Sequence, residues 1–224
     1  MKKTLSIVLC LVLCLALFAG CRTDAPEADK SAPKKEKAED SAKVVSPLPE
    51  TLDINNLDNC TVAVSLKEGD AYVDDSGKMV MKLKVYSYEL YDMVDIASLS
   101  KNDVIVRLGE EIKITELERR DTGLVVINGG EENGGFDLIS NDSTVYYEIG
   151  MSDAKAFYEL GEVILPVSTE FEYIDTSDLD ADEKKYYPGD FLTDAGIRYN
   201  FVPYNTTVVI ADGVIVKMNK VYMP

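Results

Sequence analysis

The arrangement of apolar and polar positions from Asn59 onward is typical of a β protein. Short runs alternate apolar with polar residues, and turn signals recur between them. The pattern predicts a mostly β fold with little helix: a small barrel or sandwich of antiparallel hairpins, either undivided or made of two β subdomains.

The first half of this region contains two predicted hairpins. Strands at 61–66 and 71–73 lead through the turn Asp74-Asp75-Ser76-Gly77 into a long strand at 78–91. Residues 95–100 are long enough only for a helical turn. Asp92 and Asp95 fit either capping and turn residues or metal ligands, and we favour caps and turns. The second hairpin pairs 104–108 with 112–118 across a turn at Gly109-Glu110.

The middle of the chain has one unbroken apolar run at 124–127, after the turn Asp121-Thr122-Gly123. Such a run predicts a central strand covered on both faces. Strands at 136–139 and 145–149 follow it.

The second half is less uniform. Residues 152–160 fit a short helix capped by Ser152 or a strand, and we favour the strand. Strands are expected at 163–167 and 171–174, and an acidic helical turn at 179–187. A closing hairpin joins 206–210 to 214–222 through Asp212-Gly213.

The first 20 residues have the features of a cleaved signal peptide. Lys2 and Lys3 form a basic start, residues 5–18 are almost purely apolar, and Ala19-Gly20 are small. The apolar stretch falls short of the roughly 20 residues that a membrane-spanning helix needs.

The run Leu17-Phe18-Ala19-Gly20-Cys21 resembles the lipobox of bacterial lipoproteins. This resemblance implies that Cys21 receives a diacylglycerol group, becomes the first residue of the mature chain, and anchors it to the extracytoplasmic side of the cell membrane. The two acyl chains of this group bury enough methylenes for lasting attachment, whereas a single chain gives only marginal, reversible binding.

The organisation expected from these patterns has four parts. Residues 1–20 are the signal peptide, and residues 21–50 are the lipidated Cys and a disordered tether. Residues 51–150 form a β barrel or sandwich subdomain, and 151–224 a second β-rich segment. The tether lacks large apolar residues before Val44-Val45 and would span roughly 30 Å as a flexible coil.

Missing residue types exclude several kinds of chemistry. The chain contains no His and no Trp, and Cys60 is the single thiol after Cys21. Ser-His-Asp and Cys-His catalysis, His-ligated zinc, multi-Cys metal sites and intramolecular disulfides of the mature chain are therefore excluded. Cys60 shares alternation parity with Val62 and Val64, which predicts a core position.

The charge restricts the partners. The chain without Lys2 and Lys3 carries 21 basic against 40 acidic residues, a net charge of −19. Nucleic acid is not expected as a partner, because phosphate binding needs clustered Lys and Arg. Besides the membrane, reached through the lipid anchor, we expect an unknown protein or glycan ligand.

An acidic segment at 175–183 is a candidate Ca²⁺ site, since calcium takes six to eight oxygen ligands. Its candidate ligands are Asp175, Asp178, Asp180 and Asp182. The EF-hand spacing fails at Glu183 and Gly189, so a solvated acidic loop is the main interpretation. No other cofactor is expected.

A glycine-rich segment at 128–135 is a candidate ligand loop through its backbone amides. Its candidate residues are Asn128, Gly129, Gly130, Asn133, Gly134 and Gly135. A turn that needs positive φ explains the same composition, and we favour it. Phosphate is disfavoured by Glu131 and Glu132.

No catalytic residue is predicted. Asp121-Thr122-Gly123 resembles the aspartic protease loop, but Arg119-Arg120 before it, Leu124 after it and the absence of a second copy fit a plain turn. We expect an anchored ligand-binding or interaction module rather than an enzyme. The alternative is a hydrolase of cell-envelope polymers that uses two carboxyl groups.

Overall fold

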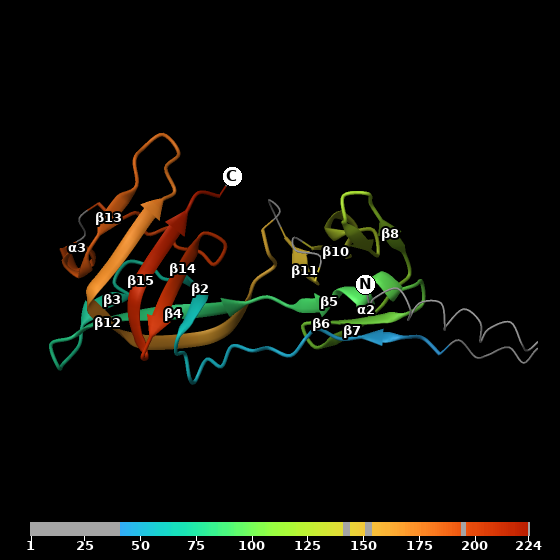
Figure 1. Cartoon of the computed structure of the whole chain (residues 1–224), viewed down its shortest axis with the longest axis horizontal. Coiled ribbons are helices and arrows are strands. Elements are labelled where there is room, and N and C mark those ends of the chain that lie inside the picture. The colour runs from blue at the N-terminus through green and yellow to red at the C-terminus, as the bar shows by residue number, and fades with distance from the viewer. Residues whose placement is uncertain (1–40, 141–143, 151–153, 194–195, 224) are drawn as a thin grey trace, which may run out of the picture. The chain divides into compact units, whose positions relative to one another are not determined.

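The computed structural model describes residues 41–140, 144–150, 154–193 and 196–223. The predicted signal peptide, Cys21 and residues 22–40 lie outside these ranges, as does Ser152. Residues 41–224 form one compact unit. It is mostly β, as the alternation predicts (Figure 1). No helix in the described ranges is both long enough and apolar enough to cross a membrane.

Five of the described strands close into a barrel. They are β2 (Cys60–Ser65), β4 (Met79–Ser87), β12 (Tyr158–Thr176), β14 (Thr206–Ala211) and β15 (Val214–Val221). Around the barrel the order is β2-β4-β12-β15-β14 and back to β2, with β12 and β15 parallel and every other pair antiparallel. This is the strand connectivity of the OB-fold, a five-stranded Greek-key barrel.

Alternation along these strands builds the barrel core. In β4, Met81, Leu83 and Val85 are fully buried, whereas Lys82 and Lys84 between them form ion pairs on the outer surface. Residues from all five strands join this core, together with Phe191 of the helix α3 (Pro188–Thr193). Two short strands extend the barrel sheet: β3 (Ala71–Val73) beside β4 and β13 (Lys184–Tyr186) beside β12.

A second set of strands comes from the chain between β4 and β12, together with one strand that precedes β2. A five-stranded sheet has the order β5 (Leu90–Asp92), β11 (Val145–Ile149), β10 (Phe136–Ile139), β9 (Val125–Ile127), β8 (Leu117–Arg119). A three-stranded sheet joins β1 (Val44–Val45), β6 (Val104–Arg107) and β7 (Glu110–Lys113). With α2 (Met93–Ser98), which Asp92 caps, they enclose a separate hydrophobic core. The short 3-10 turn Glu131–Asn133 connects β9 to β10 and contributes no buried residue.

Several predicted elements are confirmed here. The hairpin of β14 and β15 turns at Asp212 and Gly213, both with positive φ. Strand β9 is buried at every residue and has a neighbour on each side, as its unbroken apolar run predicts.

The predicted division at residue 150 is wrong as a boundary between β units. Strands β2 and β4 from the first segment and β12, β14 and β15 from the second close one barrel. The predicted tether also ends too late, because Val45 is buried and pairs with Ile105 of β6. An apolar Val44-Val45 pair at the end of a polar segment is enough to add a short strand to an open sheet edge.

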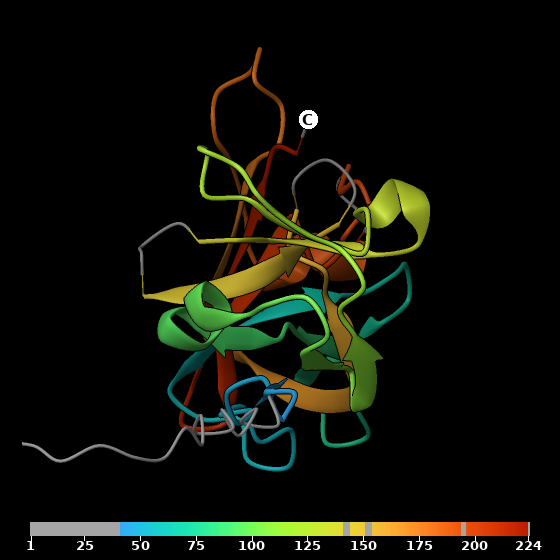
Figure 2. The same cartoon turned by 90° about the vertical axis from the view of Figure 1, so that its right-hand side faces the viewer.

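Two local predictions differ from the structure, and one helix was not expected. The separate strands expected at 163–167 and 171–174 are one strand, β12, which Figures 1 and 2 show curving round the barrel. It first pairs with β4 and then with β15, with a register shift near Gly161. The helical turn expected at 179–187 is instead a loop and β13. Helix α3 was not predicted.

Candidate functional site

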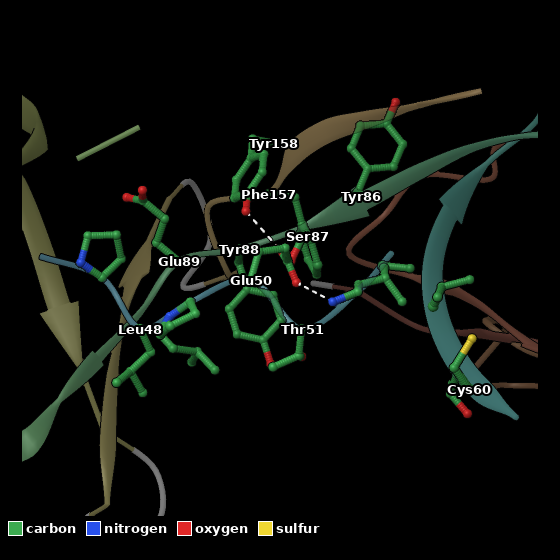
Figure 3. A pocket seen from close by; sticks show the side chains of 17 residues that line it. Leu48, Glu50, Thr51, Cys60, Tyr86, Ser87, Tyr88, Glu89, Phe157 and Tyr158 are labelled. Atoms are coloured by element: carbon green, nitrogen blue, oxygen red, sulfur yellow. Dashed lines mark hydrogen bonds between the residues drawn. The ribbon is translucent and has the colours of Figure 1, made fainter. Parts of the chain in front are cut away.

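A pocket of the described residues forms where the barrel wall opens. Pairing between β2 and β4 ends at Ala63 and Tyr86, although β2 continues back to Cys60 on β14. The strands part there, and a cavity of about 700 Å³ opens between them. We call it the seam pocket. Its walls come from 47–52, 60–63, 86–90 and 157–158 (Figure 3).

Glu50 lies in the middle of the seam pocket, between Tyr88 and Ser87 (Figure 3). One carboxylate oxygen accepts a hydrogen bond from the Leu52 backbone N–H at 2.8 Å, and the other accepts one from the Tyr158 hydroxyl at 2.8 Å. Burial raises the pKa of Glu50, but hydrogen bonds from Ser87, Leu52 and Tyr158 outweigh this effect, so the pKa lies below its usual value. Glu50 is therefore ionised at neutral pH.

The second carboxylate of the lining, Glu89, is already engaged. Its Oε2 accepts from the Tyr91 hydroxyl at 2.8 Å, and its Oε1 accepts from the Leu108 N–H at 2.9 Å. Figure 3 shows this carboxylate turned away from Glu50. Glu89 therefore ties the end of β4 to the β6–β7 turn, and Glu50 is the carboxylate available to a ligand.

Aromatic side chains form one end of the site. The rings of Tyr88 and Phe157 meet edge to face with centroids 5.5 Å apart, and Tyr88 meets Tyr147 in the same way at 6.0 Å. The Lys155 ammonium lies 3.8 Å from the centroid of the Tyr88 ring and donates a hydrogen bond of 2.6 Å to its hydroxyl. Tyr88 therefore already binds one primary ammonium group of the chain itself.

Cys60 lies at the opposite side of the pocket from Glu89 and packs against the barrel core, in line with its predicted parity. Burial, and after it the charge of Asp58, raises the pKa of its thiol. A thiol held protonated is a poor nucleophile, so Cys60 contributes surface to the pocket rather than reactivity.

The predicted ligand loop at 128–135 uses its polar groups internally. The Asn128 side chain accepts hydrogen bonds from the backbone N–H groups of Thr115 and Glu116 and donates one to the Lys113 carbonyl. Asn133 donates to the carbonyl of Gly129. Gly129, Gly130 and Gly134 have positive φ. These contacts and positive φ values explain why residues 128–135 are rich in Asn and Gly: the segment is a structural turn. Ligand binding by this loop stays a prediction.

Gly135 is needed for a different reason. A Cβ atom built on it would lie 2.0 Å from the Ile127 carbonyl oxygen. The backbone of the loop therefore packs directly on β9, where no side chain fits.

The predicted calcium ligands are brought together only in part. Asp175, Asp178 and Asp182 line a hollow of about 20 Å³ with Lys184 and Arg198, and Asp180 does not. This volume holds about one water molecule. Among the residues that the structure describes, no group of three acidic or thiol side chains could hold a metal ion. Calcium binding by this loop stays a prediction.

Asp175 has a structural partner instead. Its Oδ2 accepts from the Tyr173 hydroxyl at 2.8 Å and lies 3.8 Å from the ammonium of Lys220, which is completely buried. Lys220 also donates to Asn200 Oδ1 and to the Arg198 carbonyl. Asp175 thus balances a buried charge at the end of the barrel.

The seam pocket was not predicted from the sequence. Its residues come from four segments spread over more than one hundred positions, and only the fold brings them together. One local signal exists: Ser87 and Glu89 interrupt the apolar alternation of the long strand expected at 78–91, at the point where β4 ends and the pocket begins.

Comparisons with protein families, with curated proteins and with solved structures find no match for this chain. The function is therefore inferred from the geometry of the seam pocket and from the sequence features at the N-terminus.

Proposed function

We propose that this chain is a lipid-anchored extracytoplasmic protein whose barrel binds a small ligand in the seam pocket. The ligand is either a free small molecule or an exposed group of an envelope component. The observation that carries the proposal is the pocket itself: about 700 Å³, within the range of roughly 300–1,000 Å³ found for ligand sites, with aromatic walls and a fixed carboxylate.

Binding is favoured over hydrolysis by the state of the carboxyl groups. A hydrolase of this kind needs a general acid with a raised pKa. The described carboxyl groups whose pKa departs from the usual value are all shifted downward: Glu50, Asp74, Glu118, Glu162 and Asp175. No observation therefore supports the two-carboxylate hydrolase.

A pocket-filling substitution tests the proposal. Ala63→Trp places an indole in the seam pocket, and Val94→Trp places one on α2 at a position that is 71% exposed. The purified full-length protein in detergent micelles is screened by ligand-observed NMR against a panel of cationic, neutral and anionic fragments.

We expect fragments that bind the unmodified protein and Val94→Trp but not Ala63→Trp. Circular dichroism of both variants controls for folding. If no fragment binds, or if every binder is retained by a folded Ala63→Trp variant, the seam pocket is not a ligand site and the proposal fails.

A further inference from the structure

The charges that line the seam pocket all have one sign. Of its seventeen lining residues, Glu50 and Glu89 are charged, and neither Lys nor Arg is among them. The whole chain is also strongly acidic, with a net charge of −17. Such a field raises the local concentration of cations and lowers that of anions.

The Glu50 carboxylate is fixed in place without being neutralised. Its hydrogen-bond donors include the Leu52 N–H and the Tyr158 hydroxyl, both uncharged. Among the ion pairs of the described residues, none includes Glu50. Neutral donors orient a carboxylate but leave its full negative charge available to a ligand.

The aromatic side chains at one end of the pocket already contact a positively charged group. Lys155, which does not line the pocket, places its ammonium 3.8 Å from the Tyr88 ring centroid and 5.1 Å from that of Tyr147. Tyr88 and Phe157 both line the pocket. Binding sites for quaternary ammonium ligands recurrently use such aromatic side chains.

We infer that the seam pocket binds a small organic ammonium ion, with Glu50 as its counter-charge and Tyr88 and Phe157 as its apolar packing surface. The inference rests on the proposed function and names the class of ligand. Lys155 opposes the binding of a cation, because its own positive charge lies next to the Tyr88 ring. Removing the charge of Glu50 should therefore weaken ligand binding, and removing the charge of Lys155 should strengthen it.

Three probes of nearly equal shape separate charge from shape. Choline carries a quaternary ammonium, 3,3-dimethylbutan-1-ol is its uncharged isostere, and 3,3-dimethylbutanoate is the anionic counterpart. Their dissociation constants for the full-length protein in micelles are measured by ligand-observed NMR titration at constant salt, since screening by salt weakens exposed charge interactions.

We expect choline to bind more tightly than the alcohol, and the anion to bind most weakly. Glu50→Gln keeps the shape and should weaken choline binding about fivefold while leaving the alcohol unchanged, the size expected for an accessible ion pair. Lys155→Met should strengthen choline binding about twofold, because it removes a positive charge that repels the ligand cation. Glu89→Gln, whose carboxylate faces away, is the matched control and should have a smaller effect than Glu50→Gln.

The outcomes separate this inference from the proposed function. If the alcohol binds as well as choline, or if Glu50→Gln leaves the preference unchanged, the pocket is not selective for ammonium and the inference fails. The proposed function survives that result as long as Ala63→Trp abolishes binding. If none of the three probes binds, the inference also fails, and the fragment panel alone decides the proposed function.

Discussion

At the scale of single residues, Asp175 shows how one carboxylate stabilises a buried cation. Burial raises the pKa of Asp175, but hydrogen bonds from Ser177 and Tyr173 and the charge of Lys220 outweigh this effect and lower it. Burial also lowers the pKa of Lys220, against the attraction of Asp175. The charged state of Lys220 inside the barrel therefore depends on Asp175 remaining ionised.

This dependence predicts a variant with a pH-dependent loss of stability. A carboxyl group whose pKa is lower in the folded state stabilises the fold above its unfolded pKa, and the contribution disappears as the pH falls through the folded pKa. We expect Asp175→Asn to lower the free energy of unfolding at pH 7 by about 2 kcal/mol, because it leaves a buried charge without its partner. Urea unfolding at pH 7, 5, 4 and 3 should show the difference shrinking below about pH 4.

The neighbouring Asp178→Asn is the control, because Asp178 is exposed and its change should stay within about 0.5 kcal/mol. A difference between Asp175→Asn and the unmodified protein that stays constant from pH 7 to pH 3 would show that the Asp175 charge does not stabilise the fold.

At the scale of elements, the β6–β7 hairpin contains a residue in an unfavourable conformation. Its two central turn residues, Leu108 and Gly109, have φ of 49° and 80°. Hairpin turns with two positive φ values favour Asn-Gly, and a leucine there is strained. Its side chain is 56% exposed, so little burial compensates for the strain.

We therefore expect Leu108→Asn to raise the free energy of unfolding by about 0.5–1 kcal/mol, since Asn tolerates the left-handed region and keeps the backbone N–H that Glu89 accepts. Urea denaturation measures the change. Leu179→Asn is the matched control at a 72% exposed leucine without positive φ, and we expect no gain there. An equal gain in both variants would mean that lower surface hydrophobicity, not relief of strain, is the cause.

The elements also show what the sequence could and could not predict. Turns such as Asp74–Gly77 and Asp212–Gly213 were predicted because their chemistry is local. Strand β12 was not predicted as one strand, because its polar stretch around Ser168 looks like a break and only pairing with β4 and β15 keeps it extended. The seam pocket was missed because it depends on where two strands part, and that point is set by long-range pairing.

At the scale of the whole molecule, the strand connectivity of the barrel does not by itself identify a function, because one fold supports many. The pocket lies where β2 and β4 separate, and the second set of strands enters the chain directly after β4. The insertion that follows β4 thus coincides with the opening of the barrel wall. Position in the barrel, charge and aromatic lining together carry the functional proposal.

The proposed anchor gives a prediction for the complete chain. Two cysteines remain after the predicted signal peptide: Cys21 in the lipobox-like run and Cys60 in the barrel. If Cys21 carries the lipid, Cys21→Ser should abolish incorporation of radiolabelled palmitate in cells, whereas Cys60→Ser should leave it unchanged. Cys60 is a suitable control because burial and the charge of Asp58 raise the pKa of its thiol, which keeps it unreactive. Palmitate retained in Cys21→Ser, or absent from the unmodified chain, would remove the anchor from the proposal and leave the ligand site to be judged alone.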